Sequence, residues 1–412
     1  MVPASIEKIT LFLAGDGGFY NFRIPVLVRT KKGALIAFAE AREDDGSDWA
    51  HSALVSRRCP DPLDNFYTWE PMSTIHVSNR LTSDINWIKM PYVEKYAKKL
   101  GLDMEADDFE PKVGVPTHNA VPIVDQDGKT IHLVFCTHYD KMFYTKSVDD
   151  GISWDKPIDI TRVVDTFQDK FSWEAMAAGP GHGLQLEEGK HEGRLIVPVW
   201  LAESWTHKPS VATSIYSDDN GVTWQPGEII PSDFGSPSEA TAIQLADGSI
   251  LVNARSHGSV EKGNEFAHRM FATSRDGAYG WSKFQYDEAL PEPVCMGSIV
   301  RFTKDDAIHG TSRIIFTIPD CLDYPGGNTK NRRNLTAFLS YDECKTWSVK
   351  RTIECGLAGY SDLAIDDKEG WIYCLYEESS LNGNPWLAAS FRIAKLNLEW
   401  LTNSKDKFKV VI

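Results

Sequence analysis

A short motif that recurs along the chain constrains the fold more than any other feature. Segments of the form Ser-x-Asp-x-Gly-x-[Ser/Thr]-Trp begin at Ser147 and Ser217, and a third segment, beginning at Ser340, has Cys344 in place of the glycine. In such a motif the aspartate accepts backbone N–H groups across a hairpin turn, and the glycine adopts a positive φ. The tryptophan is then placed to fill the gap between neighbouring sheets. We therefore expect these segments to be structural rather than to contact a ligand.

Two further stretches match the motif more loosely. Ser274-Arg275-Asp276 is followed at the proper distance by Trp281, and the segment from Ser56 to Trp69 is consistent with a first copy that carries an insertion. Successive starts at 147, 217, 274 and 340 leave room for four short strands and their loops, which is typical of a β-propeller. Six blades of about 69 residues would use the whole chain. The sequence predicts an all-β fold, a six-bladed β-propeller of four-stranded antiparallel sheets, as a single domain over residues 1–412.

Apolar runs that follow turn residues predict strands between the motifs. These runs are Ala34–Ala39, Thr130–Phe135, Arg194–Trp200, Ile250–Ala254 and Trp371–Tyr376. Tyr92–Leu100 departs from this pattern, because its apolar residues recur at helical spacing before Gly101. We therefore expect an insertion around residues 85–113 that carries a short helix.

The overall charge restricts the classes of partner. The formal net charge is −15 and the pI is about 5.2, which argues against general nucleic-acid binding and against an anionic membrane surface. An anionic substrate would have to be held by a local cluster of arginines. No run of 18 apolar residues occurs, so no membrane insertion is expected.

Cysteine spacing and the N-terminal residues carry less information. The seven cysteines are odd in number and scattered, which suggests neither a disulfide framework nor a zinc site. The apolar run Ile9–Ala14 is too short for a signal peptide and lacks its basic region. The localisation stays open: secreted or periplasmic if a leader was removed, and cytoplasmic otherwise.

One arginine stands alone within an apolar strand, in Asn21-Phe22-Arg23-Ile24-Pro25, which runs on into Val26–Arg29. A buried guanidinium needs an anionic partner, since an unpaired buried charge is costly. For an isolated arginine the usual explanation is a structural ion pair. Pro25 lacks a backbone donor, so the strand should lie where that donor is not required.

Together with the repeated motifs and the order of polar residues, this stretch resembles the exo-sialidases (neuraminidases) of bacterial and animal type over nearly the whole length. The resemblance implies that three arginines bind the substrate carboxylate. They correspond to Arg23, Arg255 and Arg332, the last chosen by its spacing from Ser340, with Arg333 as the alternative. Planar guanidinium groups offer paired donors to a carboxylate, and three of them outweigh a net negative surface.

The resemblance also implies a tyrosine nucleophile, which is an exception among glycosidases. Gly359-Tyr360-Ser361-Asp362-Leu363 matches its context, and Glu239, in Ser236–Thr241, matches the glutamate that activates it. A neutral phenol avoids the repulsion that a carboxylate nucleophile would meet at a carbon bearing a carboxylate, but it needs a base and nearby cations. Taken alone, Glu239 would be an exposed turn residue and Tyr360 a packing aromatic.

The acid/base residue implied by the resemblance is Asp48, in the polar loop Gly46–Ala50. Asp44 and Asp45 are alternatives, but the distance to the next strand, Ala53–Arg57, favours Asp48. A flexible loop would allow it to protonate the leaving oxygen and later to activate water. Glu377 resembles the family's glutamate that orients the first arginine, which makes it a supporting residue.

Several other residues were considered as parts of a site. Gly179-Pro180-Gly181-His182-Gly183 lacks the Lys-Ser/Thr ending of a phosphate loop and no helical pattern follows, so it predicts a turn. His118, Asn119 and His138 are pocket candidates, but no spacing requires them. Trp173 is a candidate wall for an N-acyl group.

These observations predict a retaining exo-sialidase that removes terminal sialic acids through a covalent glycosyl-tyrosine. The expected partners are sialylated glycans of glycoproteins, glycolipids and oligosaccharides, acted on by a monomer with no cofactor and no metal. A non-catalytic sialic-acid-binding propeller is the main alternative, but the presence of Tyr360, Glu239 and Asp48 together argues against it. A trans-sialidase or intramolecular sialidase would use the same residues.

Overall fold

The chain folds almost entirely into antiparallel strands. The computed structural model describes residues 3–79, 114–234, 236–258, 266–321, 332–384 and 387–409. Helical segments in these ranges are short: the 3-10 helix η1 (Asp16–Gly18) and the helices α2 (Thr161–Asp165) and α4 (Leu398–Leu401). The predicted all-β class is confirmed. The insertion predicted around residues 85–113 lies outside the described residues, so it stays a prediction.

Three sheets of the described chain have four strands each, in sequence order. The first contains β2 (Asn21–Arg29), β3 (Leu35–Arg42), β4 (Ser52–Cys59) and β5 (Ser73–Val77). The second contains β6 (Thr117–Val124), β7 (Ile131–Thr137), β8 (Lys141–Ser147) and β9 (Ile158–Asp159). The third contains β15 (Pro237–Gln244), β16 (Ile250–Ser256), β17 (His268–Ser274) and β18 (Gln285–Pro291).

A five-stranded sheet lies between the second and third of these in the sequence. It contains β10 (Ala175–Ala178), β11 (Leu184–Gln185), β12 (Leu195–Ala202), β13 (Ser210–Ser217) and β14 (Gln225–Pro226). Both β10 and β11 pair with β12, so the short inner edge is interrupted between them. The strands predicted from the apolar runs are all present, with ends that differ by at most three residues.

The largest sheet has seven strands and is divided by one long strand. It contains β19 (Ser298–Thr303), β20 (Arg313–Pro319), β21 (Arg333–Ser340), β22 (Val349–Asp366), β23 (Trp371–Glu378), β24 (Ser390–Asn397) and β1 (Ile6–Leu13). The first part of β22 pairs with β21, and its second part, from Ala358, pairs with β23. The N-terminal strand β1 completes this sheet by pairing with β24, near the other end of the chain.

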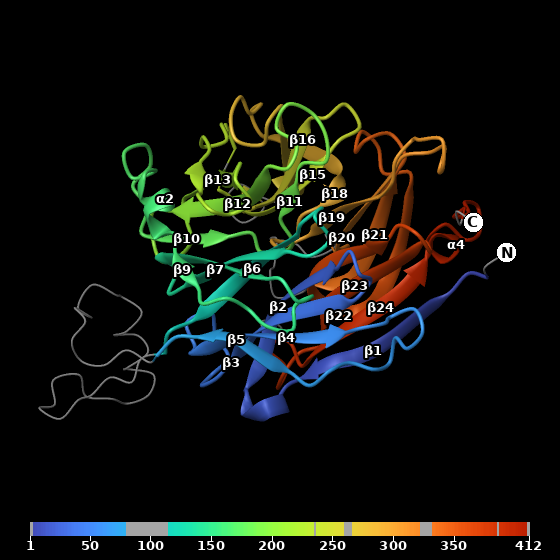
Figure 1. The fold of residues 1–412 in the computed structure, drawn as a ribbon, viewed down its shortest axis with the longest axis horizontal. Coiled ribbons are helices and arrows are strands. Elements are labelled where there is room, and N and C mark those ends of the chain that lie inside the picture. Colours follow the sequence, from blue (N-terminus) through green and yellow to red (C-terminus); the bar gives the residue numbers. More distant parts are fainter. Residues whose placement is uncertain are drawn as a thin grey trace, which may run out of the picture.

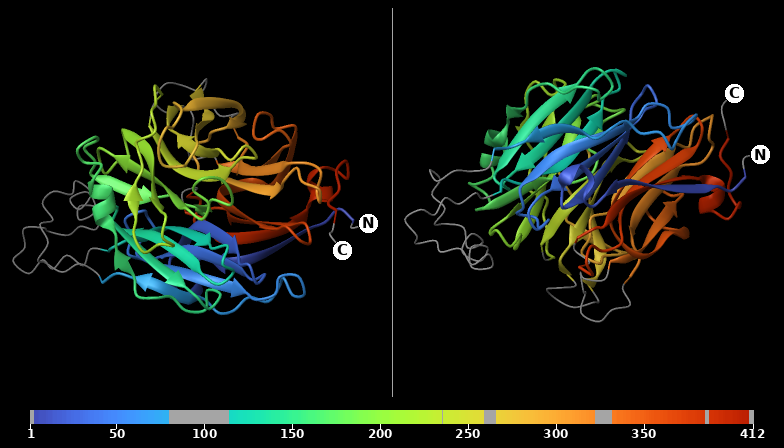
Figure 2. Two further views of the ribbon diagram at one scale, coloured as in Figure 1. Left: turned by 45° about the horizontal axis from the view of Figure 1, so that its top comes forward. Right: turned by 90° about the horizontal axis from the view of Figure 1, so that it is seen from below.

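The sheets are arranged around a common centre in the order of the chain. Figure 1 shows the colour passing from blue through green and yellow to red around that centre, and Figure 2 shows β1 running alongside the red C-terminal strands. The strands nearest the centre, which we call the inner strands, are β2, β6, β10, β11, β15, β19 and the second part of β22. Neighbouring inner strands pack against each other, as β2 does against β22 and β6.

The repeated motifs form the turns that the sequence predicts. In the copy at Ser217, the Ser217 hydroxyl donates to Asp219 Oδ1 at 2.8 Å, and the same Oδ1 accepts the Thr223 N–H at 2.8 Å. The Gly221 N–H donates to Ser217 Oγ, and Gly221 has a φ of 79°. The third copy keeps this geometry with Cys344 at a φ of 65°, so the turn holds a side chain in the left-handed region.

The loose copies differ from one another. Ser274 Oγ donates to Asp276 Oδ1, as in the full motifs, and Trp281 is buried. Between Ser56 and Trp69 the turn is instead held by Asp61, whose Oδ1 accepts the N–H groups of the second and third residues after it.

The tryptophans of the motifs pack against the preceding sheet. The Trp224 ring lies 5.5 Å from the Tyr144 ring on β8, and the Trp154 ring lies 5.9 Å from the Phe38 ring on β3. Trp224 is 6% exposed within a large apolar cluster. Each of these tryptophans therefore stabilises the packing of one sheet against its neighbour, because the contact between the rings buries apolar surface.

Other features of the described chain bear on what the fold can hold. All seven cysteines are described, and none forms a disulfide. The described residues contain no group of His, Cys, Asp or Glu side chains arranged to hold a metal ion. No helix in them has the length and apolar character needed to cross a membrane.

We predict that Trp224→Ala lowers the free energy of unfolding by about 3–5 kcal/mol, because it leaves a cavity between two sheets. Thermal or denaturant unfolding measures the loss. The catalytic rate per folded molecule should barely change. Unchanged stability combined with lost activity would contradict the structural role of the motif.

Candidate active site

Three side chains from three different sheets converge near the beginnings of the inner strands. Arg23 is the third residue of β2, Glu239 the third of β15, and Tyr360 the third of the second part of β22. The antiparallel pairing slips at each of these places: between Arg23 and Val26, between Pro237 and Ala240, and between Ala358 and Ser361. A β-bulge bends its strand and re-aims a side chain, so the bulges account for the convergence.

Tyr360 and Glu239 form the closest contact at the centre. The Tyr360 hydroxyl lies 2.6 Å from Glu239 Oε1 and 2.7 Å from Oε2, and the ring is buried. Burial raises the pKa of the Tyr360 phenol well above its ordinary value, and the Glu239 carboxylate adds to the effect. Tyr360 therefore keeps its proton and donates a hydrogen bond to Glu239.

Arg255, from β16, completes this group. Its Nη1 lies 2.7 Å from Glu239 Oε2 and 2.7 Å from the Tyr360 hydroxyl. The guanidinium remains charged: burial works against it, but Glu239 and Tyr360 together raise the pKa of Arg255. A cation at this position would stabilise a phenolate if the proton moved to Glu239.

Arg23 is held by Glu377, the residue predicted to orient it. Arg23 Nε donates to Glu377 Oε1 at 2.6 Å, and both side chains are almost fully buried. The same Oε1 accepts the Ile24 N–H, and Oε2 accepts the Tyr360 N–H at 3.1 Å. The structural ion pair expected for an isolated arginine is thus present, and its carboxylate also fixes the backbone of Tyr360.

Arg332 is the third arginine at this centre, and its side chain is buried. Its guanidinium carbon lies 5.0 Å from the centroid of the Tyr360 ring, and that of Arg23 lies 5.6 Å from it. An Nη2 of Arg332 donates to the Val294 carbonyl. The alternative, Arg333, begins β21 and is half-buried. The geometry places Arg332 beside Tyr360.

Asp48 lies in the loop after β3, where its side chain is 51% exposed. Arg42 Nη1 donates to Asp48 Oδ1 at 2.8 Å, and the other arm of the same guanidinium donates to Glu40 at 2.6 Å. Partial desolvation opposes the ionised form, but Arg42 and then Arg23 outweigh it and hold the pKa of Asp48 well below its ordinary value. Asp48 is therefore ionised.

The neighbouring carboxylates shape the loop. Asp44 Oδ2 accepts the His51 N–H at 3.2 Å, and Asp45 Oδ1 accepts the Ser47 N–H at 3.1 Å. Of the three aspartates, Asp48 is the one that contacts Arg42 in an ion pair.

A pocket of about 420 Å³ opens beside this loop, and of the three arginines around Tyr360 only Arg23 lines it. Its lining includes Arg23, Arg42 and Asp48, and Asn384 and Leu387 reach it from the far end of the chain. The volume falls in the usual range for small-ligand sites. Arg23 and Arg42 give this lining two positive charges, which would attract an anionic ligand.

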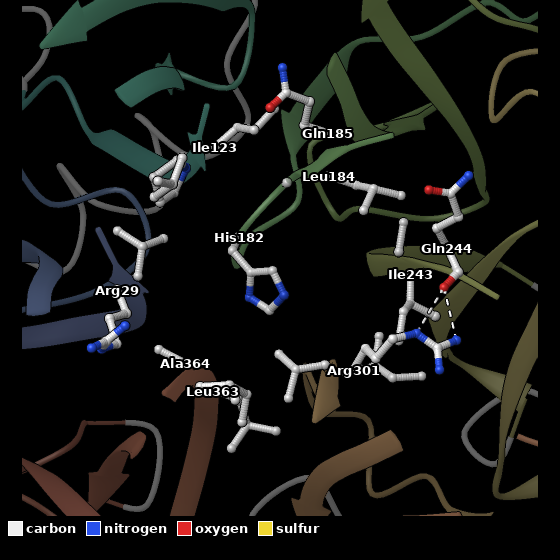
Figure 3. Close-up of a pocket in the computed structure, with 18 of the residues that line it drawn as sticks. Arg29, Ile123, His182, Leu184, Gln185, Ile243, Gln244, Arg301, Leu363 and Ala364 are labelled. Atoms are coloured by element: carbon white, nitrogen blue, oxygen red, sulfur yellow. Dashed lines mark hydrogen bonds between the residues drawn. The ribbon is translucent and has the colours of Figure 1, made fainter. Parts of the chain in front are cut away.

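A second pocket, of about 260 Å³, lies at the opposite ends of the inner strands. Figure 3 shows His182 at its centre, surrounded by apolar side chains such as Ile243 and Leu363. His182 Nδ1 lies 2.8 Å from Asp362, which is fully buried two residues after Tyr360. The predicted turn at Gly179–Gly183 is a bend that places this histidine and leads into β11.

Sequence reasoning missed Glu40 and Arg42. Both are about 2% exposed and lie two residues apart on one face of an otherwise apolar strand. Two opposite charges on one face of a buried strand are a signal, because each needs a partner there. Trp49 was also missed: its ring lies 5.0 Å from that of Tyr139 and 5.4 Å from that of Trp205, beside Asp48.

The weaker pocket candidates have structural partners. His118 stacks on the Tyr139 ring at 3.9 Å and accepts the Tyr139 N–H, while Asn119 donates to the Ala178 carbonyl. His138 lies 5.7 Å from Trp205. Trp173 is buried in the apolar cluster on which Trp49 packs, and it does not line the pocket that contains Asp48.

Comparison with known proteins gives a consistent result. Residues 103–374 match the family described as "BNR repeat-like domain". The chain is 28% identical over 337 residues to an exo-alpha-sialidase of Arthroderma benhamiae, covering 80% of this chain and 70% of that protein. It is 28% identical to a sialidase of Micromonospora viridifaciens, covering 95% of this chain and 54% of that protein. It is 27% identical to Sialidase-2 of Rattus norvegicus, over 91% and 93% of the two chains.

Solved structures share the fold. The Hadza microbial sialidase Hz136 aligns with a TM-score of 0.70 at 22% identity, covering 94% of this chain and 68% of that one. The intramolecular trans-sialidase from Ruminococcus gnavus aligns with a TM-score of 0.69 at 16% identity, covering 95% and 98%.

We predict that the double variant Glu40→Gln/Arg42→Gln raises the pKa of Asp48 towards that of an ordinary aspartate, because it removes the nearest cation without leaving Glu40 unpaired. Carboxyl carbon NMR titration, with Asp48→Asn to assign the signal, measures the change. In the matched control Glu40→Gln, Arg42 remains and the pKa of Asp48 should stay low. An unchanged pKa in the double variant would contradict the assigned cause.

Proposed function

The chain belongs to the BNR repeat-like family and, with its relatives, to the sialidases, which are glycoside hydrolases; on this premise we propose that it removes terminal sialic acids from glycoconjugates with retention of configuration. The substrates would be sialylated glycoproteins, glycolipids and oligosaccharides. The observation that carries the proposal is the contact of the Tyr360 hydroxyl with both Glu239 and Arg255.

The three arginines beside Tyr360 are proposed to bind the substrate carboxylate. Arg23, Arg255 and Arg332 all lie beside Tyr360, so a carboxylate bound by them would put the adjoining anomeric carbon close to the phenol. Guanidinium groups bind carboxylates through paired N–H donors. Arg23 already pairs with Glu377, and Arg255 with Glu239, so the charges of both arginines are compensated before substrate binds.

In the first step, the Tyr360 oxygen attacks the anomeric carbon and its proton passes to Glu239. The bond from that carbon to the leaving oxygen breaks, and Asp48 donates a proton to that oxygen. In the second step, water attacks the same carbon, Asp48 takes the proton from water, and the bond to Tyr360 breaks as Glu239 returns its proton. Two inversions give net retention.

Asp48 has a low pKa, so substrate binding must raise this pKa if Asp48 is to donate a proton in the first step. Arg23 contributes to holding the carboxylate ionised. A substrate carboxylate bound to Arg23 would offset that positive charge, and desolvation by the sugar would add to the effect. Binding would therefore prepare the acid that the first step needs.

We also propose that the fold is a six-bladed propeller. Dividing the seven-stranded sheet at β22 gives two units of four strands, β19 to β22 and β22 to β24 with β1. With the other four sheets this makes six blades in a single catalytic domain. The contact between Tyr360 and Glu239 is of no evident use to a protein that only binds sialic acid, so catalysis is favoured over a non-catalytic propeller.

We predict that a 3-fluoro sialosyl fluoride labels Tyr360, because the 3-fluorine slows the oxocarbenium-like steps while fluoride still departs. Intact mass should show one added sugar, and peptide mapping should place it on Tyr360. Tyr360→Phe should remove the label and most activity while the protein stays folded. A label on Glu239, or turnover without any label, would defeat the tyrosine mechanism. NMR of the products of a natural sialoside would distinguish hydrolysis from transfer.

We also predict that Asp48→Ala slows cleavage of natural sialosides far more than cleavage of activated aryl sialosides. An aryl leaving group of low pKa needs little protonation, whereas a sugar alcohol needs much. The two kcat/KM ratios, variant over parent, are the measurement. Equal losses on both substrates would show that Asp48 is not the acid.

A further inference from the structure

A wholly buried ion pair lies close to the arginines and has no role in the steps above. Arg269, on β17, donates from Nη1 to Glu292 Oε2 at 2.6 Å, and neither side chain is exposed to solvent. Replacing a buried pair with apolar side chains is often neutral or stabilising, so such a pair needs an explanation other than stability. Its remaining hydrogen bonds supply one.

The pair holds the backbone on both sides of Arg255. Glu292 Oε2 also accepts the N–H of Ser256, the next residue, at 3.1 Å. Two residues before Arg255, Arg269 Nη2 donates to the Asn253 backbone carbonyl at 3.4 Å, and its Nε donates to Asn253 Oδ1 at 2.7 Å. The strand that carries Arg255 is therefore fixed before and after it by one charged pair.

The pair also holds the turn that contacts Arg332. Glu292 Oε1 accepts the Cys295 N–H at 2.8 Å, and Arg269 donates to the Cys295 carbonyl at 2.8 Å. This closes the turn Glu292–Cys295 with Val294 at a φ of 56°, which is strained for a β-branched residue. The Val294 carbonyl accepts the hydrogen bond from Arg332, so the strained turn faces that guanidinium.

We infer that Arg269 and Glu292 are positioning residues that set the spacing between Arg255 and Arg332, so that both guanidinium groups can bind one substrate carboxylate. The inference rests on the proposed function. Neither residue touches the substrate. The ion pair suits this task because hydrogen bonds to charged groups are directional and strong, whereas apolar packing at the same place would allow the turn to relax.

The test uses Glu292→Gln. The glutamine amide has one acceptor oxygen, so it cannot accept all three hydrogen bonds that the Glu292 carboxylate accepts, from Ser256, Cys295 and Arg269. The probes are the 2,3-unsaturated analogue of N-acetylneuraminic acid and its methyl ester, which lacks the negative charge. The parent should bind the acid more tightly than the ester. In the variant this preference should fall about tenfold, because one charge-assisted contact is misplaced. KM for an aryl sialoside should rise with it.

A second variant guards against misfolding of the first. Arg269→Lys keeps the buried charge but cannot bond Asn253, Glu292 and Cys295 together, so it should lower the acid-over-ester preference in the same way. The matched control is Asp406→Asn, which breaks the pair between Asp406 and Arg313, 2.7 Å apart and remote from the arginine cluster. It should lower the melting temperature and leave the preference unchanged.

The outcomes separate the two proposals. A parent that binds acid and ester equally would overturn the proposed function, and this inference with it. A parent that prefers the acid, together with folded variants that keep the full preference, would overturn the positioning role alone. A similar loss of preference in the control would also overturn it, since any destabilisation would then suffice.

Discussion

Three guanidinium groups surround one tyrosine ring in a buried site, and the need to compensate their charges shapes the rest of the molecule. Like charges brought together out of water are costly, so each guanidinium must find an anionic or carbonyl partner. Arg23 uses Glu377, Arg255 uses Glu239, and Arg332 uses a backbone carbonyl. Arg23 and Glu377 come from different sheets, so their ion pair also fixes how two sheets face one another, whereas Arg255 and Glu239 lie in the same sheet.

The bulges allow one set of inner strands to serve both the site and the core. In a regular strand, side chains alternate between the two faces of the sheet from one end to the other. The bulges at Arg23, Glu239 and Tyr360 interrupt this alternation, so the first residues of these strands can direct their side chains differently from the rest. Beyond them, residues such as Leu27 and Leu363 are buried in the ordinary way. The geometry of the candidate site at one end of the inner strands therefore does not dictate packing at the other end.

Local features of the fold could be predicted from the sequence, and features assembled at long range could not. The motif turns at Ser147, Ser217 and Ser340 depend on hydrogen bonds within five residues, so their spacing is visible in the chain. Tyr360 and Glu239 carry no such local signature, and only the family resemblance suggested them. Arg42 and Trp49 were missed because their contacts with Asp48 and Tyr139 depend on the path of a loop.

The pairing of β1 with β24 has a consequence for how the protein is made. Arg23 meets Glu377 across 354 residues, and the N-terminal strand finds its neighbour only in the last sheet. At about 5–20 residues per second, a ribosome needs roughly 20–70 s to add that length. During this interval the growing chain can form its earlier sheets, but Glu377 is not yet present to pair with Arg23, and β24 is not yet present to pair with β1. The site can therefore form only after Glu377 has been synthesised, so a chain that stops before Glu377 cannot assemble it.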